Sequence, residues 1–290
     1  MKSFSKTVLS AAAGILFTLG SAQAATVVGT LFPGANQLSD NSAESLINVN
    51  GGATIVDVGD RLRGIFVIDT IEGLAGGGTR SLLDGSGNNE LTGVFDVTVA
   101  SKTAAGGGSF IFTFAPTASF ATEIGGPAGS AVAFFDGGAT HNYSRIGCGT
   151  TGFGGTCEAN VTDVGSPIWV AGFGGDSFWQ AFAFTDNIAA IGAGGSSSVG
   201  GFFNIGLELL ANTSGRIFNN VVCNTPAGVA TSGLEFCGSG SLLGRGGAST
   251  PYDSFDNVDF TISVVPEPAS IALAGLALLG LGLTSRRRKG

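Results

Sequence analysis

His141 is the only histidine of the chain, so any imidazole-dependent chemistry has to use it. Asp136 and Ser144 lie close to it in sequence, and a Ser-His-Asp site needs these three side-chain types in hydrogen-bond contact. A serine hydrolase of the α/β type would also place its nucleophile in a Gly-x-Ser-x-Gly turn. The sequence contains no such turn. We therefore interpret His141 as a loop residue and predict that the protein is not an enzyme.

A glycine-rich stretch at 147–152 matches the spacing G-x-G-x-x-G. That pattern binds a dinucleotide only where it follows a strand and opens a helix. Here it adjoins two cysteines, and no helical period follows it. We interpret the match as a coincidence in a chain with 50 glycines, and no cofactor is predicted.

Two groups of oxygen-bearing side chains could hold calcium. Residues 84–90 place such side chains at alternate positions, but Asn89 stands where an EF-hand loop requires glycine. We interpret this stretch as a polar turn and assign no metal ligand. A second acidic group at 253–259 comprises Asp253, Asp256, Asn257 and Asp259. Jelly-roll binding modules often hold structural calcium with late acidic strands, so calcium here is a fold-level analogy. Glycosidase chemistry would need two facing carboxyl groups, and no pair among the acids is singled out by its context.

The four cysteines predict two disulfides. Pairing between neighbours would join Cys148 to Cys157 and Cys223 to Cys237. Closing a loop of about 15 residues stabilises a fold by roughly 3 kcal/mol in the chain-entropy model. A zinc site is the alternative, but the spacings include no Cys-x-x-Cys and only one histidine is present.

The N-terminal residues 1–24 have the features of a signal peptide. Lys2 and Lys6 form a basic start, residues 8–19 are apolar, and residues 22–24 read Ala-Gln-Ala. This pattern predicts export and cleavage by signal peptidase after Ala24. An exported protein meets an oxidising environment, which agrees with the predicted disulfides.

The C-terminal residues 266–290 form a second targeting segment. Pro266, Glu267 and Pro268 precede an uncharged apolar run at 269–283, and four basic residues follow at 286–289. The segment resembles the PEP-CTERM sorting signals of Gram-negative bacteria. The resemblance implies processing by an exosortase, a membrane-inserted helix over 269–283 before processing, and a link to extracellular polysaccharide or biofilm. A tail-anchored membrane protein is the alternative.

Charge separates the exported region from its targeting segments. Six of the 13 basic residues and one of the 21 acidic residues lie in the two terminal segments, so residues 25–265 carry 7 basic and 20 acidic residues. Such a surface repels nucleic-acid backbones, and we predict no nucleic-acid partner.

Residues 25–265 are predicted to form one all-β domain, an antiparallel sandwich or jelly roll, flanked by the signal helix and the C-terminal transmembrane helix. Apolar residues alternate in 258–264, and three phenylalanines share one face of 110–114. Residues 179–184 are expected to be buried on both faces, and residues 38–47 to form a short helix. Further strands are predicted at 26–32, 53–58, 62–71, 93–100, 131–135, 167–173, 201–210 and 217–222.

Three functions compete for this domain. The sequence favours a non-enzymatic surface or matrix protein, located at the cell surface or secreted after an inner-membrane stage, and exopolysaccharide is the partner that we expect for it. The alternatives are a carbohydrate-binding module, with or without stabilising calcium, and a secreted hydrolase. An aromatic groove would favour carbohydrate binding, and the side chains that could form one are Trp169, Trp179, Tyr143 and Tyr252.

Overall fold

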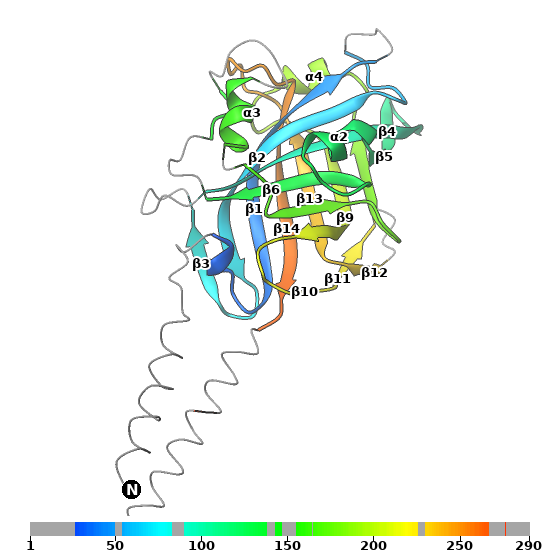
Figure 1. The fold of residues 1–290 in the computed structure, drawn as a ribbon. Helices are drawn as coiled ribbons and strands as arrows, with labels where there is room; N and C mark the ends of the chain where they lie inside the picture. The colour runs from blue at the N-terminus through cyan, green and yellow to red at the C-terminus, as the bar shows by residue number, and fades with distance from the viewer. Residues whose placement is uncertain are drawn as a thin grey trace, which may run out of the picture.

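The computed structural model describes residues 27–49, 54–82, 90–137, 143–146, 155–163, 165–225 and 230–266, together with Leu276. Within these ranges antiparallel strands dominate (Figure 1). The strands are β1 (Gly34–Ile47), β2 (Arg61–Gly73), β3 (Gly78–Ser81), β4 (Leu91–Gly106), β5 (Ser109–Pro116), β6 (Ser130–Asp136), β7 (Trp169–Gly172), β8 (Phe178–Ala183), β9 (Val199–Asn212), β10 (Phe218–Asn219), β11 (Val221–Asn224), β12 (Ala230–Leu234), β13 (Phe236–Leu243) and β14 (Ser254–Val264). The helical segments are η1 (Val28–Thr30), α2 (Ala118–Glu123), α3 (Thr156–Val161) and α4 (Ile188–Gly192).

The principal sheet closes on itself. Its hydrogen-bonded neighbours run β2–β1–β14–β13–β9–β7–β6–β4, and β4 pairs again with β2. Strands β4 and β9 are long: one part of each pairs with β6 or β7, and the other part pairs with β5 or β8. The all-β antiparallel class is thus confirmed. One closed sheet replaces the two separate layers that a sandwich would have.

The interior of this closed sheet is the main core. It is built from aromatic and aliphatic side chains that alternate with outward residues along each strand. Phe134 is central, with its ring centroid 5.1 Å from that of Phe66 and 5.6 Å from that of Trp169. A smaller apolar cluster lies outside the sheet beneath α2 and α3 and includes Ile65, Val94 and Phe120.

Glycine and phenylalanine form reciprocal pairs across β2 and β4. Gly64 lies opposite Phe95, and Phe66 lies opposite Gly93. A Cβ atom on Gly93 would lie 2.1 Å from Phe66 Cζ, and one on Gly64 would lie 2.4 Å from Phe95 Cζ. Each ring therefore lies over a strand position that only glycine leaves open. These pairs give a structural reason for part of the chain's unusual content of both residue types.

An ion-pair network fixes the outer helices to the sheet. The Arg63 guanidinium on β2 contacts Asp96 on β4, Glu123 on α2 and Glu158 on α3. Its side chain is 4 % exposed, and the interaction with Glu123 lowers the pKa of that carboxyl. The network joins two helices and two strands through one buried cation.

The chain enters and leaves the domain at the same end. Gly34, the first residue of β1, lies opposite Val264, the last residue of β14 (Figure 1). Residues 27–31 cover this end of the sheet, with Val27 and Val28 buried. Their backbone N–H groups donate to the two carboxylate oxygens of Asp136 at 2.9 and 2.8 Å.

Several local predictions were wrong. Residues 38–47 belong to β1 and not to a helix, because this stretch pairs with both β14 and β2. Residues 27–32 contain the 3₁₀ turn η1 in place of a strand, and the stretch 53–58 shows only one isolated bridge in its described part, between Ile55 and Asn187. Strand β8 is buried on one face only, since Phe184 just after it is 47 % exposed.

The remaining strand predictions are confirmed, although β4 extends six residues beyond the predicted 93–100, β14 begins four residues before the predicted 258–264, and 217–222 divides into β10 and β11. Strands β3, β12 and β13 were not predicted. No helix in the described ranges is long and apolar enough to cross a membrane. Of the expected helix at 269–283 these ranges include Leu276 alone, so the structure gives that prediction no support, and the signal peptide lies outside them.

Candidate functional site

The predicted acidic group near the end of the domain does not converge. Successive side chains of a strand point to opposite faces, so β14 directs Asp256 into the interior and Asn257 and Asp259 to the outside. Asp253 instead accepts a hydrogen bond from the Leu46 N–H at 2.8 Å. Among the described residues no group of three His, Cys, Asp or Glu side chains could hold a metal ion. These four side chains therefore do not share one site in the described structure.

Three carboxyl groups face the interior instead. Asp40 and Glu44 on β1 join Asp256 on β14, and each is at most 5 % exposed. Asp40 Oδ1 accepts from the Val258 N–H at 2.6 Å, and Glu44 Oε1 accepts from Ser254 Oγ at 2.7 Å. Asp256 Oδ1 has no hydrogen-bond partner within the described part of the chain.

Burial raises the pKa of all three carboxyl groups. Desolvation is the main cause in each case, and for Asp40 and Glu44 the charge of Asp256 adds to it. The pKa of Asp256 rises to about 6. These buried acids are therefore protonated at mildly acidic pH. Ionising them inside the protein costs free energy.

Glu44 and Asp256 line an interior cavity of about 40 Å³. Its other walls are mainly apolar and include Phe112, Phe114 and Trp179. A glycosidase would need two such carboxyl groups across a cleft that holds the sugar. The cavity is near the size of one or two water molecules, whereas a sugar ring needs several times that volume. The arrangement therefore offers acid groups without room for a saccharide substrate.

An open groove lies on the outer face of β9, β13 and β14, with a volume of about 330 Å³. Strand register places its polar side chains in two rows. Asn204 lies opposite Ser239, which lies opposite Asp259, and Phe202 lies opposite Ser241, which lies opposite Asn257. Ser39 on β1 extends the first row, because its Oγ donates to Asp259 Oδ1 at 2.6 Å. Amide, hydroxyl and carboxylate groups thus follow one another across four strands.

Exposed phenylalanine rings border this groove. Phe202 is 50 % exposed and Phe184 is 47 % exposed. The Phe184 ring meets Phe202 at 5.9 Å and Phe182 at 5.6 Å, both edge to face. These three neighbouring aromatic rings form a contiguous apolar patch on the outer surface. Such a patch differs from the single scattered apolar residues that are normal on protein surfaces.

The groove has the chemical groups that bind a polyhydroxylated ligand. Sugar hydroxyls pair with amide, hydroxyl and carboxylate side chains, and the apolar face of a pyranose packs on an aromatic ring. No hydrogen bond within the described residues engages the Asn204 amide, so it keeps both donor and acceptor capacity. The groove is open, so an extended chain could lie along it.

The aromatic residues expected to form a groove lie elsewhere. Trp169 is fully buried, and its Nε1–H donates to Ser214 Oγ at 3.1 Å. Trp179 lines the interior cavity, Tyr252 is buried, and the Tyr143 hydroxyl donates to the Asn41 carbonyl at 2.7 Å. The Trp and Tyr residues therefore do not indicate where the groove lies. Its only sequence signal is the phenylalanine content, and the alternating Ser, Asn and Asp residues acquire meaning once the strand register is known.

The residues considered for catalysis are not assembled in the described structure. Asp136 binds the backbone of residues 27 and 28, and Ser144 Oγ donates to the Ile146 carbonyl at 2.6 Å. His141 and the glycine-rich stretch at 147–152 lie outside the described ranges, as do residues 84–89 of the polar turn. Glu90, which follows that turn, is buried and accepts a hydrogen bond from the Tyr143 N–H.

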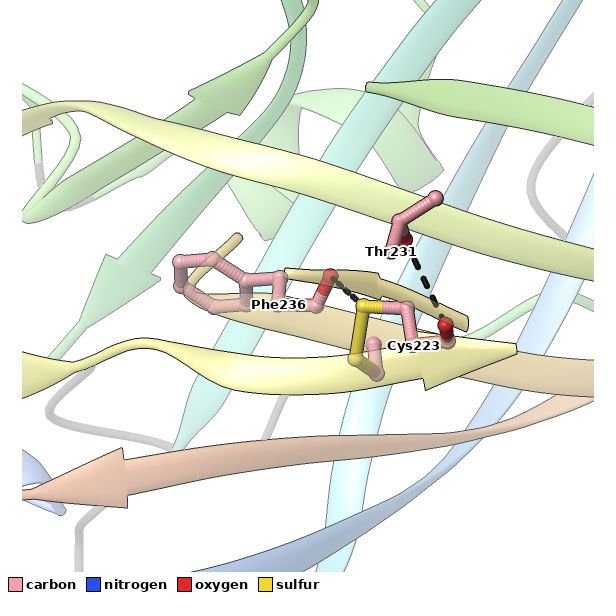
Figure 2. Close-up of a disulfide and its surroundings, with 4 residues drawn as sticks. Cys223, Thr231 and Phe236 are labelled. Atoms are coloured by element: carbon pink, nitrogen blue, oxygen red, sulfur yellow. Dashed lines mark hydrogen bonds between the residues drawn. A yellow bond between two sulfur atoms is a disulfide. The ribbon is translucent and has the colours of Figure 1, made fainter. Parts of the chain in front are cut away.

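The second predicted disulfide is confirmed. Cys223 on β11 is bonded to Cys237 on β13, with Cα atoms 5.3 Å apart. Figure 2 shows this bond beside Phe236, and the Thr231 hydroxyl donates to the Cys223 carbonyl at 3.3 Å. The bond attaches the small β11–β12 sheet to the closed sheet. Cys157 is also disulfide-bonded. Its predicted partner Cys148 lies outside the described ranges.

Comparison with known proteins identifies the C-terminal segment. Residues 264–289 match the family model of the PEP-CTERM protein-sorting motif, which begins here at the last residue of β14. No curated protein and no solved structure matches the chain. The motif implies export and processing by an exosortase, and it leaves the activity of the β domain open. The sorting signal predicted from Pro266, Glu267 and Pro268 is confirmed, and the chain carries the PEP-CTERM sorting motif at residues 264–289.

Proposed function

We propose that this protein is a non-enzymatic component of the cell surface or extracellular matrix, which associates with exopolysaccharide through the groove on β9, β13 and β14. The observation that carries the proposal is the double row of polar side chains beside exposed Phe202. The sorting motif supports it, because an exported protein with such a groove meets polysaccharide outside the cell.

Sorting would proceed in two steps. Signal peptidase would cleave after Ala24, and the precursor would remain in the inner membrane through residues 269–283. An exosortase would then act at the Pro266–Pro268 motif and deliver the domain to the surface or the medium. The charge of the domain agrees with an extracellular role that involves no nucleic acid.

Carbohydrate binding by the groove needs no metal ion in this proposal. The groove's carboxylate, Asp259, already accepts a hydrogen bond from Ser39, which orients it toward hydroxyl ligands. The domain would therefore act as an adhesive module within a matrix protein, without a calcium requirement.

The test is binding of the purified protein to exopolysaccharide extracted from the producing cells, measured by affinity electrophoresis. Phe202→Ala combined with Asn204→Ala removes one ring contact and one amide, together about 2 kcal/mol. Binding should weaken roughly thirtyfold. Val222→Ala, at a position 67 % exposed and outside the groove, is the matched control and should bind like the wild type. Equal binding by the double variant and the wild type would remove the groove from the proposal.

A further inference from the structure

We propose that the end of the domain where β1 begins and β14 ends rests on the lipid headgroups of the membrane while the precursor is anchored. We call this surface the tail-proximal face and define it by Phe32, Leu74, Arg80, Arg216 and Ile217. The proposal goes beyond the function proposed above and depends on the predicted membrane insertion of residues 269–283.

The tether between domain and membrane is very short. Strand β14 ends at Val264, and the apolar run begins at residue 269. The four residues between them span at most about 14 Å when fully extended. The headgroup layer above the hydrocarbon core is itself about 5 to 8 Å thick. The end of β14 therefore cannot lie more than about one nanometre above the headgroups.

The apolar run at 269–283 is shorter than the hydrocarbon core of a bilayer is thick. Its fifteen residues reach roughly 22 Å as a helix, whereas a hydrocarbon core is about 30 Å thick. With the run inserted as proposed and the arginines at 286–288 at the cytoplasmic surface, the mismatch would be taken up by local thinning of the bilayer or by drawing the tether inward. The second response would bring the tail-proximal face closer to lipid.

Exposed apolar side chains lie on this face. Ile217 is 61 % exposed, and its carbonyl accepts from the Val265 N–H at 2.8 Å, directly beside the start of the tether. Leu74 is 47 % exposed, and its N–H donates to the Ala35 carbonyl next to the start of β1. Both side chains are exposed at the end of the domain from which the tether leaves, and burial of such side chains in the interfacial region is favourable.

The face also has basic groups in a domain that is otherwise acidic. Arg80 is exposed, with its guanidinium 4.7 Å above the Phe32 ring, and it makes no ion pair with any described residue. Arg216 donates to the Gly29 carbonyl at 2.9 Å. Glu72, exposed on β2, is an opposing charge on this face, and the Asp136 carboxylate, which accepts from the N–H groups of Val27 and Val28, lies at the same end of the domain. Guanidinium groups bind phosphate well, so headgroup phosphates are suitable partners for Arg80 and Arg216.

The test uses the full-length precursor in liposomes that contain brominated lipid, which quenches tryptophan at the membrane. Leu74→Trp and Ile217→Trp place a reporter on the tail-proximal face. Val58→Trp is the matched control, because Val58 is 54 % exposed and lies near the other end of β1, roughly 40 Å away along the strand. Trp169 and Trp179 are buried, so their emission in the wild type provides the baseline.

The proposal expects emission of the Leu74→Trp and Ile217→Trp proteins to fall in brominated vesicles relative to the wild type, and emission of the Val58→Trp protein to stay at the baseline. Adding Arg80→Glu to Leu74→Trp should reduce the quenching. Unquenched emission from both reporters, or equal quenching of all three, overturns the proposal. So does a precursor that fails to float with the vesicles, because the tether would then not exist. None of these outcomes bears on polysaccharide binding by the groove.

Discussion

Asp256→Asn replaces a buried ionisable carboxyl by a neutral amide. It should therefore change how the free energy of unfolding depends on pH. The wild-type carboxyl is 3 % exposed, with Oδ1 unpartnered within the described residues. Its pKa rises from 3.8 to about 6 in the folded state. A pKa that is higher in the folded state means that the folded protein binds the proton more tightly. This contribution to stability is complete below about pH 4 and is lost as the pH rises through 6.

The magnitude follows from the shift. About two pKa units at 1.36 kcal/mol each give on the order of 3 kcal/mol between pH 4 and pH 8. Asp40 and Glu44 act in the same direction, because burial raises both of their pKa values. Glu123 acts in the opposite direction, since Arg63 lowers its pKa and its contribution is lost at acidic pH. We expect the three interior acids to dominate.

The assay is urea unfolding at several values between pH 4 and pH 8, followed by the emission of the buried Trp169 and Trp179. The free energy of unfolding of the wild type should fall as the pH rises. Asp256→Asn should flatten this dependence by about 3 kcal/mol and so be relatively more stable at pH 8. Its removal also lowers the pKa of Asp40 and Glu44, which flattens the curve further. A wild-type stability that increases across this range, or an unchanged slope in the variant, would refute the reasoning.

Three further predictions concern the fold and its processing. Gly93→Ala should lower the free energy of unfolding by about 3 kcal/mol, because its Cβ would meet Phe66, while Val222→Ala at an exposed site should change it little; urea unfolding measures both. Replacing Cys223 and Cys237 together by alanine should cost about 3 kcal/mol, and non-reducing peptide mapping of the wild type should recover these two cysteines in one linked pair. Intact mass spectrometry of surface-extracted protein should show a chain that lacks residues 1–24 and the basic tail, and a main species that retains Arg286 would contradict the predicted processing.

The sequence predicts strands well where apolar residues alternate with polar ones. Residues 258–264 and 110–114 are examples, because one face of each is buried against the core. It fails at β1, where Asp40, Ser42 and Glu44 occupy the inward positions that apolar residues normally take. Their burial depends on partners from β14, 210 or more residues away in the chain, such as Ser254 for Glu44. A local pattern contains no information on such partners.

Strand β13 was missed for a different reason, because glycines occupy its inward positions. Gly238 and Gly240 have low intrinsic preference for strands, so Phe236–Leu243 was not predicted. In the structure, phenylalanine rings from neighbouring strands occupy the space beside these glycines. A Cβ on Gly238 would meet the Phe260 ring at 3.0 Å, and one on Gly240 would meet Phe203 at 2.6 Å. The candidate groove lies on this same strand. It could not be found without knowing that β13 joins β9 to β14.

The most direct test of the account follows the protein in the producing cells. The fraction retained in the extracellular matrix is measured against the fraction free in the medium, for the wild type and for the Phe202→Ala and Asn204→Ala double variant. We predict that both proteins are exported and processed at the same sites, while the variant moves from the matrix to the medium. A processed variant that remains in the matrix to the same extent as the wild type would contradict the claim that this groove holds the protein to exopolysaccharide.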